Sequence, residues 1–359
     1  MSHLSDGPST WVIRASEPDD APSIAELFRI VYGRPTPQGH WDWKLHSLPA
    51  VNEHEWVAES DGKIVGHYAV IPIRFKLRDQ QALIPHGCDA MTHPEYRRRG
   101  ILTALGRHAN EVWARAGSPF QIGFHYGGWG SLRESLGWQP IVRLVWTKRW
   151  LRPFAGLARQ FHLPGAAIWR VPDSVFRRYA EQKAGGVHRY SGSSGVHVER
   201  VLKADERLNR LWKGISPEFD FLAIRDRPFV QWRCLDRPGV DQRLFLAERA
   251  NKPLGYIALQ IARTDAAVRA TVLDCFVAPG DMLTARALLN HAVAAAAESG
   301  ARSIAALAAP ESRLADQLKT AGFHACRHGY DFSLIPYSSS IPASTAAGWF
   351  LTGAEGDVI

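Results

Sequence analysis

The chain has 359 residues, of which 46% are hydrophobic, 22% charged and 10% aromatic, the composition of an ordinary globular protein. This excludes disordered, collagen-like and coiled-coil chains, and the length favours two domains. Apolar runs are too short to span a membrane, the first residues show no secretory pattern, and the four cysteines are scattered. We therefore expect a cytoplasmic protein with reduced thiols and, since no residues have zinc-ligand spacing, no metal.

The first half of the chain has the pattern of a mixed α/β domain. An acidic start followed by apolar residues at helical spacing predicts a helix over 17–33. Two alternating segments within 56–77, joined at Asp61-Gly62, predict a β-hairpin. A strand is expected over 84–92, a helix over 101–116, a strand over 119–126 and a short helix over 131–138.

The formal net charge of +8 is concentrated between Ile141 and Arg200, a segment with eleven basic residues and only three acidic ones. Aromatic residues lie among these basic ones, so the segment could bind nucleic acid or an anionic surface. Alternatively, the aromatics pack a connector against two domains while the arginines stay solvated. We favour the connector because no nucleic-acid motif accompanies the charge.

An internal repeat relates the two halves of the sequence. Within 40–49 and 230–238, an offset of 189 residues aligns Trp43, Lys44 and Pro49 with Trp232, Arg233 and Pro238. The same offset aligns 56–70 with 245–259, and after a gap of four residues an offset of 185 aligns 89–94 with 274–279. The repeat predicts two copies of one fold. The expected parts are a first domain over 1–150, a basic connector over 151–215, a second domain over 216–336 and a flexible tail over 337–359.

The segment between the strand and the helix, HPEYRRRGIL, places three arginines and a glycine at a helix amino terminus. Unpaired backbone N–H groups and the helix dipole attract anions there, and glycine lets a phosphate approach the backbone closely. A solvated basic turn is an equally good explanation from composition alone.

Residues 97–102 (RRRGIL) resemble the acetyl-CoA signature of the GNAT (Gcn5-related) N-acetyltransferase superfamily, with Leu102 in place of its final small residue. The preceding hairpin and the Gly-Trp ending of 131–138 are similar to other features of that family. The resemblance spans about 12–144, and about 221–334 in pattern only. It implies two tandem domains, each with a mostly antiparallel sheet flanked by helices, and transfer of an acyl group from acetyl-CoA or another acyl-CoA to an amine.

The resemblance also implies which residues bind the co-substrate. They are Met91 and Thr92, through their backbone, and Arg97, Arg98, Arg99, Gly100, Ile101, Leu102 and Thr103. The second copy has no arginine run at this place, Ala285 replaces the glycine, and Asp281 would repel a phosphate. We therefore expect the first copy to be catalytic and the second to have lost the co-substrate.

The candidates for proton transfer lie on the two strands of the same copy. Asp89 and His86 could act as, or order, a general base, although Asp89 recurs as Asp274 in the second copy, which favours a structural role. The family's usual tyrosine acid is replaced by Arg133, which leaves Tyr126 or His125 as substitutes. The expected acceptor is a small-molecule amine; acylation of a protein amine and non-catalytic acyl-CoA binding are the alternatives.

Overall fold

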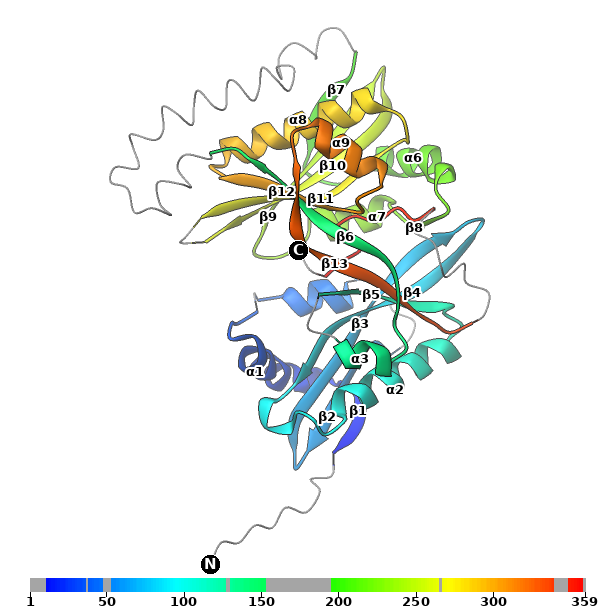
Figure 1. Cartoon of the computed structure of the whole chain (residues 1–359), viewed down its shortest axis with the longest axis vertical. Helices are drawn as coiled ribbons and strands as arrows, with labels where there is room; N and C mark the ends of the chain where they lie inside the picture. Colours follow the sequence, from blue (N-terminus) through cyan, green and yellow to red (C-terminus); the bar gives the residue numbers. More distant parts are fainter. Residues whose placement is uncertain are drawn as a thin grey trace, which may run out of the picture. The chain divides into compact units, whose positions relative to one another are not determined.

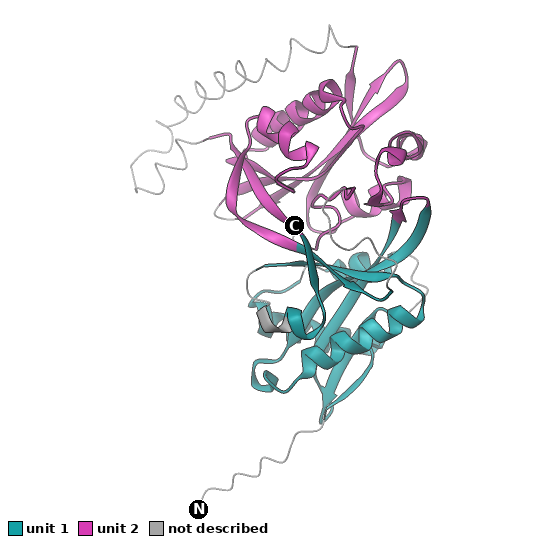
Figure 2. Cartoon of the chain, turned by 45° about the vertical axis from the view of Figure 1, so that its right-hand side comes forward, with its two compact units in different colours: residues 1–75, 80–141, 332–345 teal, residues 76–79, 142–331, 346–359 magenta. Residues whose placement is uncertain are grey.

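The computed structural model describes residues 11–36, 38–47, 53–126, 130–152, 195–264, 267–338 and 348–357. The chain divides into two compact units, each of which draws on both halves of the sequence (Figures 1 and 2). Unit 1 comprises residues 1–75, 80–141 and 332–345. Unit 2 comprises residues 76–79, 142–331 and 346–359.

Unit 1 is a mixed, mainly antiparallel sheet with helices on its faces, as the sequence predicts. Its strand order is β1-β2-β3-β4-β5, followed by the carboxyl-terminal part of β13, and only the β4–β5 pair among those described in this unit is parallel. The elements of its first half are β1 (Val12–Ala15), η1 (Pro18–Asp20), α1 (Ala21–Tyr32), η2 (Asp42–His46), β2 (Glu55–Ser60), β3 (Lys63–Leu77), β4 (Gln80–Thr92), η3 (Pro94–Tyr96), α2 (Ile101–Arg115), β5 (Phe120–His125) and α3 (Gly130–Ser135).

Helices α1 and α2 cover opposite faces of this sheet. Buried residues of α1 pack with Val57, whereas buried residues of α2 pack with its neighbours Trp56 and Ala58, and successive strand residues point to opposite faces. A Cβ atom on Gly66 of β3 would lie 2.6 Å from Cγ2 of Ile101, so this position needs glycine. The first turn of α2 is thereby held tightly against the hairpin.

Unit 2 contains a second mixed sheet, with the order β13-β6-β12-β11-β10-β9-β7. Its β11–β12 pair is parallel, and β6–β12, β10–β11, β9–β10 and β7–β9 are antiparallel. The elements are β6 (Gln139–Trp150), β7 (His197–Val201), α6 (Glu206–Ile215), η4 (Ser216–Glu218), β8 (Phe221–Ala223), α7 (Arg227–Cys234), β9 (Asp241–Arg249), β10 (Lys252–Arg263), β11 (Val268–Val277), α8 (Met282–Glu298), β12 (Ser303–Ala308), α9 (Arg313–Thr320) and β13 (His324–Pro336).

The core of unit 2 lies between its sheet and the helix pair α8 and α9 (Figure 1). Leu288, Ala292 and Ala296 form the buried stripe of α8, and Leu314 and Leu318 that of α9. Their spacing of four residues places each stripe on one helix face. Helix α8 is rich in alanine because its inner face lies close to the sheet.

Strands β6 and β13 begin 185 residues apart, which is the offset of the sequence repeat. Residues 142–150 of β6 belong to unit 2, where they pair with β12, and residues 332–336 of β13 belong to unit 1. Next to β13, the N–H of Tyr337 donates to the carbonyl of Pro119 at 2.9 Å, just before β5. Each unit therefore contains a strand segment contributed by the other half of the sequence.

Two segments differ from the expected domain boundaries. Strand β7 and helix α6 lie within 151–215, the segment predicted as a connector, and belong to unit 2. Residues 351–356, expected to be part of a flexible tail, are buried. The guanidinium of Arg225 pairs with Glu355, and Arg233 donates to the carbonyl of Ala354 at 2.9 Å. These long-range contacts hold a segment whose small, polar composition suggested loose packing.

The described residues contain no helix that is both long and apolar enough to cross a membrane. They also contain no cluster of histidine, cysteine or acidic side chains that could hold a metal ion. Most of the basic segment 141–200 lies outside the described residues. Of its described cations, Arg149 is buried and donates to the carbonyl of Ala321, and Arg143 lies 3.6 Å from Asp331.

Candidate functional site

The candidate site of unit 1 begins where strand β4 ends and turns into helix α2. The 3-10 turn Pro94–Tyr96 follows the strand. Arg98 and Gly100 then adopt left-handed backbone conformations, with φ angles of +64° and +77°. A Cβ atom at Gly100 would meet no other atom within 4 Å. The glycine is therefore required for its backbone angle and leaves the entrance to the helix open.

The amino terminus of α2 has no side-chain cap among the described residues, because its N-cap position is Gly100. The first N–H groups of a helix have no partner within the helix and carry partial positive charge. Leu102 and Thr103 of this first turn are partly exposed, whereas Ile101 is buried in the core. The turn therefore presents backbone donors on a surface that the arginines make strongly positive.

The three arginines form the outer side of this turn. Arg97 donates from Nε to the carbonyl of Thr92 at 3.4 Å, and Arg99 donates to the carbonyl of Glu95 at 3.2 Å. The guanidinium of Arg99 also lies 4.9 Å from the centre of the Tyr96 ring. All three arginines are exposed, so their charge is available to a ligand at the α2 terminus.

Strand β4 changes conformation shortly before the loop. Among the described residues, β4 pairs with β5 at His86 and Ile122. Asp89, three residues further along β4, has a left-handed φ of +46°. Met91 is fully buried against α1, and the Thr92 hydroxyl is buried without a hydrogen-bond partner in the described part of the chain. A buried hydroxyl of this kind is a candidate hydrogen-bonding group for a ligand.

Asp89 is held by a buried ion pair that the sequence pattern does not reveal. Its carboxylate lies 2.7 Å from Nζ of Lys44 and also accepts a hydrogen bond from Trp41. Burial alone would raise the pKa of Asp89, but the charge and hydrogen bond of Lys44 outweigh it and lower the pKa. A carboxylate that is stabilised in this way is a weak base, so the geometry favours a structural role for Asp89.

His67 supports the same bend in the strand. One ring nitrogen lies 2.8 Å from the carbonyl oxygen of Asp89, and the other lies 2.9 Å from the carboxylate of Glu55. Burial would raise the pKa of Glu55, but His67 and the nearby histidines lower it. His67, Glu55 and Lys44 were not predicted, because each is distant in sequence from Asp89 and belongs to no local motif.

The remaining candidates lie on β4 and at the end of β5. His86 is buried with its ring 5.5 Å from that of Phe124, and His125 is buried with its ring 4.5 Å from that of Trp138. His86 therefore does not face solvent. Tyr126, which directly follows β5, is 63% exposed. Among these three candidates it is the one that solvent reaches most readily.

Unit 2 differs from unit 1 at the corresponding helix terminus. Asp281 is the N-cap of α8; its carboxylate accepts the N–H of Thr284 at 3.0 Å and the hydroxyl of the same residue at 2.6 Å. Its negative charge occupies the place where an anion would bind. The two termini therefore differ in charge: an aspartate caps α8, whereas α2 begins at an uncapped glycine beside three arginines.

Comparison with known proteins identifies the family of this region. Residues 12–141 match a model of the acetyltransferase (GNAT) domain. These residues are a GNAT domain. The match includes strand β4, the arginine loop and helix α2, and it ends within β6. None of the curated proteins compared with the chain matches it.

Solved structures support the fold over most of the chain. A GCN5-related N-acetyltransferase from Anabaena variabilis ATCC 29413 has a TM-score of 0.64 and 13% identity, covering 92% of this chain and 73% of its own. One from Kribbella flavida has a TM-score of 0.59 and 15% identity, and the match covers 90% of this chain and 70% of that one. A conserved protein from Enterococcus faecalis V583, described as a probable N-acyltransferase, has a TM-score of 0.63 and 11% identity. The match covers 90% of this chain and 71% of that one. At these identities the similarity establishes the fold.

Proposed function

We propose that the chain is an acyl-CoA-dependent N-acyltransferase, with acetyl-CoA as the main donor and a small-molecule amine as the acceptor. The observation that carries this proposal is the open amino terminus of α2, next to Arg97–Arg99, at the end of the strand that contains the left-handed Asp89. Backbone N–H groups, a helix dipole and guanidinium groups together suit a pyrophosphate.

The residues present fit such a co-substrate on two further counts. Gly100 leaves open space at the helix entrance, and the buried Thr92 hydroxyl lacks a partner among the described residues. When bound, the thioester supplies the activated acyl group. The first turn of α2 and the arginines would hold the phosphates, and the backbone of Met91 and Thr92 would orient the acyl end. Unit 2 has no role in this binding, because Asp281 caps its corresponding helix.

We assign proton donation to Tyr126, which replaces the tyrosine that the family places on the last helix. Its phenol is exposed at the end of β5, where it can give a proton to a leaving thiolate. His125 packs against Trp138 and serves to position this strand end. We assign no base to Asp89, whose ion pair with Lys44 keeps it ionised, and solvent can accept the ammonium proton directly.

The alternative is a non-catalytic acyl-CoA-binding protein, because Arg133 occupies the place of the usual acid and the histidine candidates are buried. The test is thiol release from acetyl-CoA in the presence of a panel of primary amines, including aminosugars, aromatic amines and a lysine peptide. Turnover with a small amine above the rate of spontaneous hydrolysis supports the enzyme. Turnover with the peptide alone identifies a protein acyltransferase, and binding without turnover identifies the alternative.

A further inference from the structure

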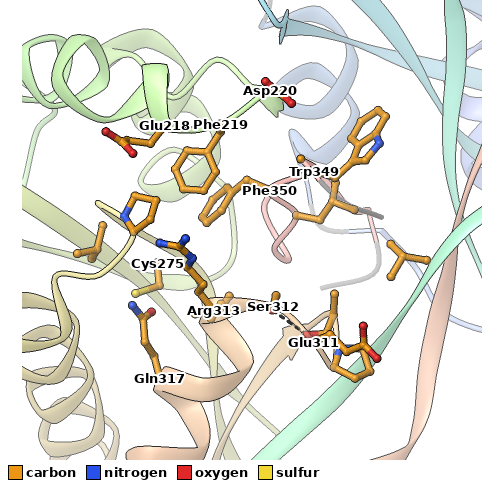
Figure 3. A pocket seen from close by; sticks show the side chains of 18 of the residues that line it. Glu218, Phe219, Asp220, Cys275, Glu311, Ser312, Arg313, Gln317, Trp349 and Phe350 are labelled. Carbon is orange, nitrogen blue, oxygen red and sulfur yellow. Dashed lines mark hydrogen bonds between the residues drawn. The ribbon is translucent and has the colours of Figure 1, made fainter. Parts of the chain in front are cut away.

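A pocket of about 750 Å³, the size of a small-molecule site, lies within unit 2 (Figure 3). It forms where the parallel strands β11 and β12 separate. Their pairing ends at Val272–Ala306, and beyond this point Cys275 and Val277 of β11 line the cavity. The lining comes entirely from unit 2, so this pocket is separate from the acyl-CoA site proposed in unit 1.

The first turns of helix α9 supply a polar end to this pocket. Gln317 is 8% exposed, and its side-chain amide has no hydrogen-bond partner among the described residues. Figure 3 shows this amide pointing into the cavity. The amide atoms themselves are reached by solvent, so a ligand with a matching polar group would replace water at this end of the pocket.

Arg313 provides a cation next to this amide. It lies four residues before Gln317, on the same face of α9, and its guanidinium extends into the cavity (Figure 3). No ion pair engages it in the part of the chain that the structure describes. A guanidinium beside an amide suits a carboxylate.

The middle of the pocket is aromatic. Phe219 and Phe350 come from segments far apart in sequence, and their ring centres are 4.7 Å apart at an angle of 51°. Trp349 also lines the cavity. The two phenyl rings form a pair against which a third ring can pack with favourable edge and face contacts.

Acidic side chains lie on the other side of the aromatic pair. Glu218 and Asp220 flank Phe219 in sequence, line the pocket and are exposed, and Figure 3 shows them on the side away from Gln317. A third carboxylate, Glu311, is exposed just before α9. The pocket thus has a guanidinium and an amide at the α9 end, where Glu311 also lies, an aromatic middle, and two carboxylates, Glu218 and Asp220, at the opposite rim. This order of groups suits a ligand whose negative and positive charges lie on opposite sides of a ring.

We propose that this pocket binds a zwitterionic aromatic compound of the aromatic amino acid class. The carboxylate contacts Arg313 and Gln317, the ring packs on Phe219 and Phe350, and the ammonium faces Glu218 and Asp220. The proposal does not depend on the acyltransferase activity, because none of these residues belongs to unit 1.

Calorimetric titration of the full chain with three probes that share a phenyl ring tests this proposal. The probes are L-phenylalanine, the anion 3-phenylpropionate and the cation phenethylamine. We expect L-phenylalanine to bind most tightly. Arg313→Gln should weaken L-phenylalanine and phenylpropionate at least tenfold and leave phenethylamine unchanged, and Gln317→Leu should weaken the same two probes. Lys319→Gln, an exposed cation on the same helix, is the matched control and should bind like the wild type.

Three results would overturn the proposal. The first is that no probe binds at millimolar concentration. The second is that phenethylamine binds as tightly as L-phenylalanine to the wild type. The third is that Arg313→Gln behaves like Lys319→Gln. Arg313→Gln and Lys319→Gln both replace exposed side chains, and we expect both variants to keep the unfolding midpoint of the wild type. Equal midpoints exclude misfolding as the cause of weaker binding. Arg313→Lys, which keeps the charge, should retain part of the affinity.

Discussion

The carboxylate of Asp281 accepts hydrogen bonds from both the N–H and the hydroxyl of Thr284, and this double contact closes the amino terminus of helix α8. Gly100 stands at the corresponding terminus of α2 and can make no such contact. One helix therefore has a terminal N–H paired with its own carboxylate, and the other begins without a side-chain cap. This difference is the basis for assigning the acyl-CoA site to the first half of the chain alone.

Removal of the Asp281 cap should cost stability without creating a second site. We expect Asp281→Ala to lower the free energy of unfolding by about 1 kcal/mol, the usual value of an N-cap. Urea unfolding measures this loss, with Asp316→Ala, an exposed acid on α9, as the control. Acetyl-CoA binding should keep its stoichiometry of one, since unit 2 has no arginine run at that terminus. A second bound acetyl-CoA would show that Asp281 alone closes a competent site.

Replacement of Lys44 should be far more damaging than replacement of an exposed lysine. Lys44 is 2% exposed and neutralises the buried carboxylate of Asp89. Lys44→Met leaves that charge buried without its partner, which we expect to cost about 3–5 kcal/mol of unfolding free energy. Lys63→Met, at an exposed site at the start of β3, serves as the control and should change stability by less than about 0.5 kcal/mol. Equal losses in the two variants would contradict the assigned ion pair.

The same pair predicts a dependence of stability on acid pH. The pKa of Asp89 is lower in the folded protein than its ordinary value near 4, so its contribution is complete above that value. The contribution is lost as the pH falls below about 4 towards the folded pKa. Asp89→Asn has no such proton to gain, and asparagine tolerates the left-handed backbone. Its stability at pH 7 should be lower, but it should fall less than that of the wild type between pH 5 and 3, as measured by urea unfolding.

Replacement of Tyr126 should separate binding from chemistry. We expect Tyr126→Phe to lower kcat by about 10²-fold, a typical effect of losing a general acid, with the affinity for acetyl-CoA unchanged. Tyr330→Phe, in unit 2, is the matched control for the loss of a phenol. If both variants keep the wild-type kcat, a different group or solvent protonates the thiolate.

Local patterns in the sequence predict much of unit 1. The Asp61-Gly62 turn, with φ values of +50° and +73°, joins β2 and β3 as expected, and the helix predicted over 101–116 is α2. These features depend on neighbouring residues, whose side-chain period and backbone preference are visible in the sequence. The GNAT resemblance, which the family match confirms for residues 12–141, depends on a similarly local signature.

Contacts between distant segments could not be predicted in the same way. Lys44 and Asp89 are separated by 45 residues, and Arg225 and Glu355 by 130, so no short window contains both partners. Helix α6 was missed although it has local signals, namely the N-cap Asp205 and the helical spacing of Leu208, Leu211 and Ile215. Burial of 351–356 depends on Arg233 of α7 and on Arg225 in the segment before it, which composition does not reveal.

Acetyl-CoA binding to a pair of glycine variants tests whether the amino terminus of α2 holds the co-substrate. Gly100 and Gly62 both have left-handed backbones with open space around the Cβ position, so aspartate meets the same local constraints at each. Calorimetry should find one acetyl-CoA per wild-type chain, unchanged affinity in Gly62→Asp, and loss of binding in Gly100→Asp, whose carboxylate caps α2 and repels phosphate. Equal affinity in the two variants, or no binding to the wild type, would contradict an acyl-CoA site at the amino terminus of α2.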